Sequence, residues 1–201
     1  MKLLTKVSNK NGEKSMNQTL ETLLKRRSIR KFKEEQIEES QLQSILEAGR
    51  FAPSAMNQQA WHFTVVQNPE VIKKLNEACK TAFLNSGNKN FEDRATSDNF
   101  SVFYNAPTLI IVTNEPNAIA PQHDGSLALG NMLNAAESMG IGSCWIHALN
   151  MVLTLDGNKS LNAELGIPEG YIPIGTGAFR YKAMETPAAP PRKTGTVTII
   201  K

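Results

Sequence analysis

Residues 108–113 read TLIIVT, a nearly continuous apolar run that directly follows Ala106 and Pro107. A strand with one face in water alternates apolar and polar residues, whereas a run without alternation is typical of a strand buried on both faces. We therefore expect residues 108–113 to lie at the centre of a sheet whose two faces are both covered.

A second strand is predicted upstream at residues 61–66 (WHFTVV), and a helix follows it at once. Asn68 can cap this helix, and Pro69 suits its first turn. Apolar residues then recur at helical spacing and should face the core, namely Val71, Ile72, Leu75 and Cys79. Residues 80–101, in contrast, are rich in Asn, Ser, Lys and Asp with little periodicity, so we expect a mobile excursion or lid there.

Downstream of the central strand, residues 124–139 are apolar around most of a helical circumference and predict a buried helix. Strand character returns at residues 143–146, 173–179 and 196–200. The last of these runs follows a proline-rich segment that should cross a surface in extended form, so it needs a sheet to join. Because helices and strands mix without strict alternation, the pattern favours an α+β layer architecture.

The composition is that of a globular domain, with 40% hydrophobic and 20% charged residues in 201. No stretch approaches the roughly 20 apolar residues of a membrane helix, and the first residues lack the apolar run of a signal peptide. We expect a cytoplasmic protein with no membrane partner. Residues 16–201 are assigned to one domain, and residues 1–15 are expected to be a polar, disordered extension.

The positive charge is concentrated at one end of the chain. Residues 1–33 hold ten basic and two acidic residues, which leaves 12 basic against 17 acidic residues, a net −5, for the rest. A nucleic-acid-binding domain would spread basic residues over a face, so a small anionic ligand suits this pattern better. Cys79 and Cys144 have no partner at metal-ligand spacing, and neither a zinc site nor a disulfide framework is predicted.

The strongest local signal is the run Arg26-Arg27-Ser28-Ile29-Arg30, between two short predicted helices. In an extended chain, alternation puts Arg26, Ser28 and Arg30 on one side, where two guanidinium groups and a hydroxyl could hold a phosphate. The alternative is a solvated basic helix end that is stabilised by the helix dipole. Arg192, after the proline-rich segment, could add a further cation.

A second signal is the polar loop from Pro53 through Ser54 and Asn57 to Trp61, between a helix and a strand. Its hydroxyl and carboxamide groups could bind the polar edge of a heterocycle, although an ordinary Asx-type turn is the alternative. No dinucleotide fingerprint, HExxH pattern or GxSxG elbow is present. We therefore predict neither a metal site nor a catalytic side chain.

Six segments in this order together resemble the FMN-dependent nitroreductases: RRSIRKF, PSAMNQQAWHF, YNAPTLIIV, MGIGSCWI, LGIPEGYIPIGTGAF and PPRK. The resemblance covers about residues 16–200. It implies a three-layer α+β fold with a central, mostly antiparallel sheet flanked by helices. It also implies a homodimer that exchanges its C-terminal strands and binds one FMN at each end of the interface.

The resemblance also assigns residues to the cofactor. It places Arg26, Ser28 and Arg30 at the phosphate and ribityl chain, with Arg27 contributing mainly through its backbone and Arg192 closing on the phosphate. The loop with Pro53, Ser54 and Asn57 would come from the second protomer. The backbone of Trp145, Ile146 and His147 would lie along the flavin ring, with the His147 amide as the candidate hydrogen-bond donor to flavin N5. Ala60 replaces the proline usual in the family, which loosens the turn slightly.

The activity that the resemblance implies is an FMN-dependent NAD(P)H oxidoreductase that reduces nitroaromatics, quinones or related small acceptors in a ping-pong cycle. The family also includes ene reductases, dehalogenases and dehydrogenating enzymes, so the acceptor and the choice between NADH and NADPH stay open. A flavin-binding or flavin-storage module without turnover is the main alternative. A nucleic-acid binder is a weaker one.

Overall fold

The computed structural model describes residues 7–8, 14–15 and 17–201. Its centre is a sheet in the order β3-β4-β6-β5, in which all neighbouring strands are antiparallel. The strands are β3 (Trp61–Val66), β4 (Thr108–Asn114), β5 (Ile141–Ile146) and β6 (Ile172–Tyr181). β4 lies inside the sheet, and all of its residues are buried, which confirms the expectation for TLIIVT.

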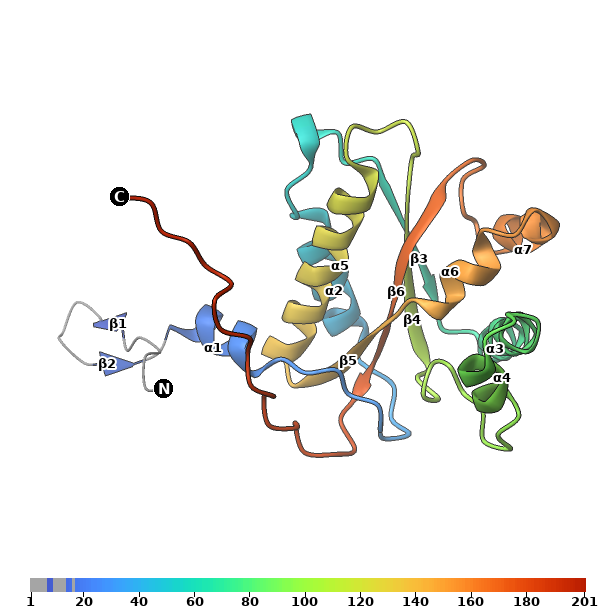
Figure 1. The fold of residues 1–201 in the computed structure, drawn as a ribbon, viewed down its shortest axis with the longest axis horizontal. Coiled ribbons are helices and arrows are strands. Elements are labelled where there is room, and N and C mark those ends of the chain that lie inside the picture. The colour runs from blue at the N-terminus through green and yellow to red at the C-terminus, as the bar shows by residue number, and fades with distance from the viewer. Residues whose placement is uncertain (1–6, 9–13, 16) are drawn as a thin grey trace.

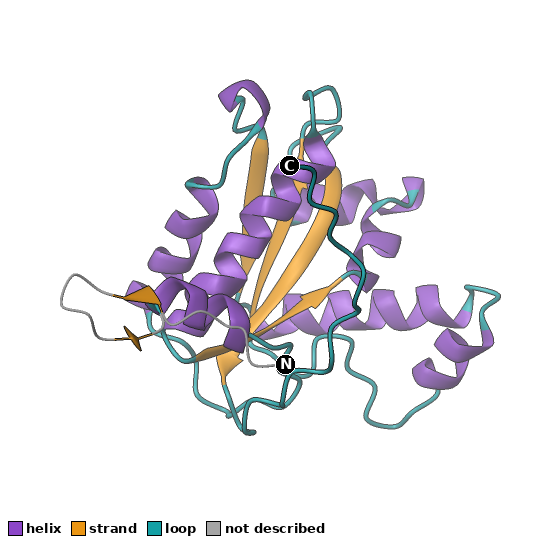
Figure 2. Cartoon of the chain, turned by 60° about the vertical axis from the view of Figure 1, so that its left-hand side comes forward, coloured by secondary structure: helices purple, strands orange, loops and turns teal. Residues whose placement is uncertain are grey.

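Helices cover both faces of this sheet, as Figures 1 and 2 show. One face packs against α2 (Glu39–Arg50) and α5 (Pro121–Ser138). The other packs against α3 (Pro69–Leu84), α4 (Lys89–Ala95), α6 (Ala148–Leu153) and α7 (Lys159–Glu164). Neighbouring residues of β4 serve the two cores in turn, since Leu109 and Ile111 join one and Ile110 and Val112 the other. The predicted three-layer α+β fold is confirmed.

The shorter elements lie around these layers. They are β1 (Val7–Ser8), β2 (Lys14–Ser15), α1 (Gln18–Lys25) and the 3₁₀ turns η1 (Ala55–Asn57) and η2 (Asp156–Asn158). β1 and β2 pair with each other, and most of the extension predicted at residues 1–15 lies outside the described residues. None of the helices described here combines the length and apolar character needed to cross a bilayer.

The expectation that residues 80–101 form an excursion without a core element was wrong. Helix α3 continues to Leu84, and the buried ring of Phe83 stacks on Phe91 at 4.7 Å and meets Phe100 edge-on at 5.8 Å. Asn76 ties the end of the segment to α3, because its amide donates to the Phe100 carbonyl and its carbonyl oxygen accepts from the Val102 amide. The aromatic residues lie at irregular intervals among polar residues, so neither periodicity nor composition predicts that they pack together.

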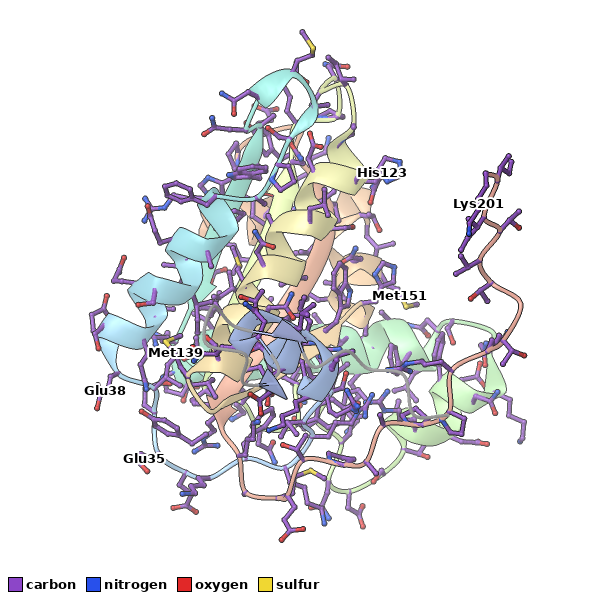
Figure 3. All side chains as sticks on the ribbon, turned by 90° about the vertical axis from the view of Figure 1, so that its left-hand side faces the viewer. Glu35, Glu38, His123, Met139, Met151 and Lys201 are labelled. Carbon is purple, nitrogen blue, oxygen red and sulfur yellow. The ribbon has the colours of Figure 1, made fainter. Side chains whose placement is uncertain are left out.

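The strand predicted at residues 196–200 is extended but pairs with no strand in the single described chain. The chain leaves β6 through an antiparallel bridge between Lys182 and Phe32 and then runs outside the packed body to Lys201 (Figures 2 and 3). Val197, Ile199 and Ile200 are 77%, 75% and 93% exposed. Three large apolar side chains exposed on one short segment are typical of a surface that binds a partner.

Candidate functional site

The basic segment extends the sheet beyond its edge strand. Helix α1 ends at Lys25, and Arg26 has the extended torsions φ −52° and ψ 131°. The Ile29 amide then donates to the Ser143 carbonyl at 2.9 Å, and Ser28 forms a parallel bridge with Ser143. Ile29 is fully buried, so alternation directs Arg26, Ser28 and Arg30 to the opposite side. The extended conformation is the one that the phosphate-binding hypothesis requires.

The charges of three arginines affect the same side chain of β5, the Cys144 thiol. Burial raises the pKa of the Cys144 thiol, while the charges of Arg30, Arg26 and Arg94 and a hydrogen bond from Ser28 all oppose that rise. None of these arginines forms an ion pair with a carboxylate among the described residues. Guanidinium groups that gather without a counter-ion form a site for an anion.

The edge of β5 beyond this cluster is open. Ser143 directs its carbonyl away from β6, towards Ile29. Because backbone groups alternate in direction along an antiparallel strand, the amides of Trp145 and His147 face the same open side. The Trp145 ring is fixed by close packing on the neighbouring strand, where a Cβ on Gly175 would come within 2.5 Å of it. The segment therefore offers backbone donors at an open, rigid edge.

The polar loop is strained and anchored. Met56, Asn57 and Gln59 all have positive φ angles, of 50°, 54° and 48°, which residues with side chains rarely adopt. Gln59 donates from its amide to Ser54 Oγ at 3.1 Å and from its side chain to Asn57 Oδ1 at 2.9 Å. Strain of this kind persists only where the surroundings hold it, and it clusters at functional sites.

Buried Asp124, which the sequence analysis did not single out, anchors this loop. Both of its carboxylate oxygens accept from the Ala55 amide, at 3.1 and 3.2 Å, and Asp124 is 3% exposed. Its only signal in the sequence was its place in the first turn of a long helix, where acidic residues are common.

We expect Asp124→Ala to lower the free energy of unfolding by about 1.5–3 kcal/mol, because it leaves a part-buried amide without its charged acceptor. Asp124→Asn, which keeps an acceptor oxygen, should lose less. Urea unfolding of the purified variants measures both. Asp93→Ala, at an exposed position on α4, is the matched control and should stay within about 0.5 kcal/mol of the parent. An equal loss in Asp93→Ala and Asp124→Ala would contradict the anchoring role.

The single chain does not bring all predicted site residues together. The loop contacts Asp124 near the start of α5, whereas the basic segment contacts Ser143 just beyond its end, and at 1.5 Å per residue the helix separates them by about 21 Å (Figure 1). Pro53, Ser54 and Asn57 are thus remote from Arg26, Ser28 and Arg30. Arg192 is exposed on the C-terminal tail and has no hydrogen-bond partner among the described residues.

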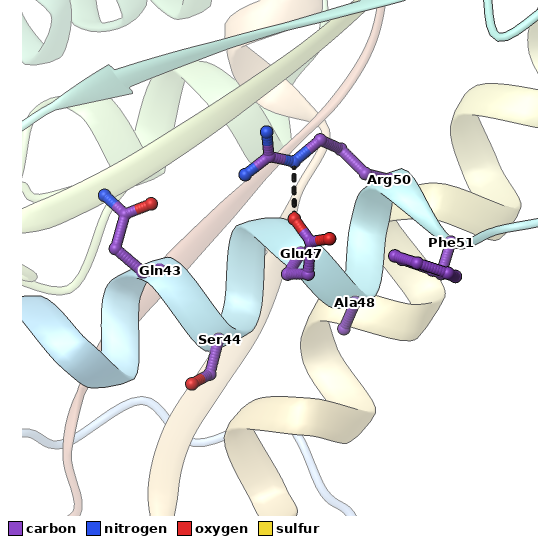
Figure 4. Close-up of a pocket in the computed structure, with 6 residues that line it drawn as sticks. All are labelled: Gln43, Ser44, Glu47, Ala48, Arg50 and Phe51. Carbon is purple, nitrogen blue, oxygen red and sulfur yellow. Dashed lines mark ion pairs between the residues drawn. The ribbon is translucent and has the colours of Figure 1, made fainter.

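Arg27 differs from its neighbours. Its guanidinium turns back to the carbonyls of Leu24 and Arg26, so it stabilises the end of α1 and does not face the open edge of β5. The expected contribution of the Arg27 backbone to the cofactor stays a prediction. A hollow of about 560 Å³ on the outer face of α2 is not part of this site, because residues between 43 and 51 line it and none of them is a predicted site residue; its Arg50 is paired with Glu47 (Figure 4).

A family model described as "Nitroreductase family" matches residues 23–179. The chain belongs to the nitroreductase family. A crystal structure of a nitroreductase with bound FMN from Bacteroides fragilis superposes with a TM-score of 0.85 at 40% identity, covering 92% of this chain and 100% of that one.

Two curated relatives have related names. One, from Archaeoglobus fulgidus, is provisionally named NADH dehydrogenase/NAD(P)H nitroreductase and is 33% identical over 162 residues, covering 78% of this chain and 81% of its own. Another, from Bacillus subtilis, is named FMN reductase [NAD(P)H] and is 30% identical over 147 residues, covering 67% of this chain and 55% of its own. The family expected from the sequence motifs is thereby confirmed, and the chain is an oxidoreductase of the nitroreductase type.

Proposed function

We propose that this nitroreductase binds FMN, oxidises NAD(P)H and reduces small acceptors such as nitroaromatics or quinones. The observation that carries the proposal is the gathering of Arg26, Arg30 and Arg94 without a carboxylate partner beside the open edge of β5. The names of the FMN-bound and FMN-reducing relatives agree with it.

The residues present fit FMN. A phosphate monoester matches the guanidinium groups of Arg26 and Arg30 and the Ser28 hydroxyl, because charge-assisted hydrogen bonds to guanidinium groups favour such anions. The Trp145 and His147 amides, on the open edge of β5, suit the polar edge of a ring system. When bound, FMN would supply the two-electron redox chemistry, while the protein supplies orientation, electrostatics and exclusion of water.

The proposal assigns no acid–base or nucleophilic role to a side chain at this edge. Burial raises the pKa of the Cys144 thiol, which keeps it protonated and unreactive at neutral pH. The His147 side chain is exposed at the start of α6, and the proposal uses only the backbone amide of this residue. Donor and acceptor would therefore use one open face of the cofactor in turn, which is the ping-pong cycle.

The proposal includes a homodimer with two sites. Leu127 on α5 and Phe51 at the end of α2 are 47% and 79% exposed, and Leu20, Leu23 and Leu24 add apolar surface on α1. A second copy would cover these faces and the apolar C-terminal tail. It would also supply the loop of Ser54 and Asn57, which lies about 21 Å from the basic segment of its own chain by helix length.

Steady-state kinetics test the proposed turnover. The purified protein should be yellow, lose its visible absorption on adding NADH or NADPH, and give parallel double-reciprocal lines when NAD(P)H and a nitroaromatic or quinone are both varied. Each substrate should inhibit competitively against the other at high concentration. Intersecting lines would contradict the shared face. A bound flavin that NAD(P)H does not reduce would favour the storage module.

A further inference from the structure

Two guanidinium groups lie against the ring of Tyr104. The Arg30 Cζ atom is 5.7 Å from the ring centroid, and the Arg30 Nε donates to the Tyr104 hydroxyl at 3.2 Å. Arg94, in the last turn of α4, has its Cζ 5.8 Å from the same centroid and 5.8 Å from that of Phe83. Aromatic faces attract cations at such distances, so one ring orients two arginines from distant parts of the chain.

The backbone at Tyr104 is strained and firmly held. Tyr104 and Asn105 are consecutive residues with φ of 55° each, in the left-handed region that disfavours residues with side chains. The Asn105 amide donates to Ser101 Oγ at 2.9 Å, and Arg180 Nη1 donates to the Asn105 carbonyl at 2.9 Å. Phe103, the residue before Tyr104, is 1% exposed. The surroundings thus force Tyr104 into one orientation.

Arg94 shares the electrostatic environment of the basic segment. Its charge and those of Arg26 and Arg30 act on the same thiol of Cys144, in spite of its position on α4. In the described part of the chain, no carboxylate pairs with Arg94, whereas Lys89 of the same helix lies 4.0 Å from Asp93. An exposed arginine that stacks on aromatic rings and keeps its charge free is arranged to meet an anion.

We propose that Arg94 binds the phosphate of the flavin nucleotide together with Arg26 and Arg30, and that Tyr104 is the positioning residue for Arg30 and Arg94. The inference rests on the proposed function, because it assumes that this site binds FMN. It assigns a role to the segment after α3, and it makes the site selective for a dianionic phosphate monoester over the same ring system without phosphate.

The test is a fluorescence titration of the full chain, freed of flavin, with FMN and separately with riboflavin. Arg94→Ala should weaken FMN binding about tenfold, since it loses a charge-assisted hydrogen bond, and leave riboflavin binding unchanged. Arg94→Lys should recover part of the loss. Tyr104→Phe, which keeps the ring and loses the hydroxyl, should weaken FMN binding about threefold. Lys89→Ala is the matched control, with both affinities unchanged.

The pH dependence separates a phosphate contact from a purely structural role. The second ionisation of a phosphate monoester has a pKa of about 6, so FMN affinity should rise as the pH rises from about 5 to 7 in the parent protein. Arg94→Ala should flatten that rise. Inorganic phosphate should compete with FMN in the parent protein and less well in Arg94→Ala.

The outcomes distinguish the two proposals. A parent protein that binds neither FMN nor riboflavin overturns the proposed function and this inference with it. A parent that binds FMN while Arg94→Ala leaves the ratio of FMN to riboflavin affinity and the pH dependence unchanged overturns the role of Arg94 alone. Equal losses of both flavins in Arg94→Ala also overturn it, because they indicate a disturbed fold; thermal unfolding of the same variant identifies that case.

Discussion

A chain truncated after Pro191 should be monomeric and free of flavin. The truncation removes Arg192 and the exposed apolar residues Val197, Ile199 and Ile200, which contact no core in the single chain. Burial of each such side chain against a partner is worth about 1.5–3 kcal/mol, so the loss for two tails exchanged in the proposed dimer is comparable with the roughly 12 kcal/mol that holds a nanomolar dimer together. Light scattering gives the mass, and the visible spectrum gives the flavin content.

The full-length variant Arg192→Ala separates the two losses. It keeps the apolar tail and removes only the charge, so the dimer should persist while FMN binding weakens. The truncated chain should still show the circular dichroism of a folded α+β domain, because both cores form without the tail. A truncated protein that stays dimeric and fully loaded with FMN would show that the tail plays no part in either.

The layered fold could be predicted from the sequence because its signals are local. The unbroken apolar run at residues 108–113 indicated a central strand, and the pair Asn68-Pro69 marked a helix start, where the Asn68 side chain indeed accepts from the amides of Glu70 and Val71. Both patterns depend on which side of a short segment meets the core.

Residues 80–101 could not be predicted in the same way. The packing of Phe83, Phe91 and Phe100 joins residues eight to seventeen positions apart, and it depends on a tie from Asn76 that has no local signature. The roles of Arg94 and Tyr104 could not be predicted from the sequence for the same reason. Their arrangement depends on left-handed backbone at two residues with side chains, which no propensity favours.

The predicted site was reached from the sequence only in part. Alternation around Ile29 was sufficient to place Arg26, Ser28 and Arg30 on one side, because the segment is short and extended. The loop of Ser54 and Asn57 lies at the other end of α5, and only in the proposed homodimer would a second chain bring it to the basic segment. Motif order along one sequence carries no signal for such an arrangement.

Arg30→Ala should weaken FMN binding by about 1.5–3 kcal/mol, or roughly 10- to 150-fold, because it removes a charge-assisted hydrogen bond to the phosphate. Arg30 is the central member of the cluster, because its charge opposes the raised pKa of the Cys144 thiol more than the charge of Arg26 or Arg94 does. The hydrogen bond to the Tyr104 hydroxyl raises the pKa of Arg30 itself. It is thus a permanent cation whose direction is set before the ligand arrives. Preorganised charges contribute more to binding than mobile ones, because less side-chain entropy is lost.

Arg30→Lys tests whether this direction matters. Lysine keeps the charge and loses both the planar fork and the Nε donor that now reaches Tyr104, so its affinity for FMN should lie between those of the parent and Arg30→Ala. Calorimetric titration of the flavin-free chain measures all three, and Arg50→Ala, on the outer face of α2, is the matched control. If Arg30→Ala and Arg50→Ala bound FMN equally well, the phosphate would have to be held elsewhere, and the open edge of β5 would be left without the anchor that places a ring beside it.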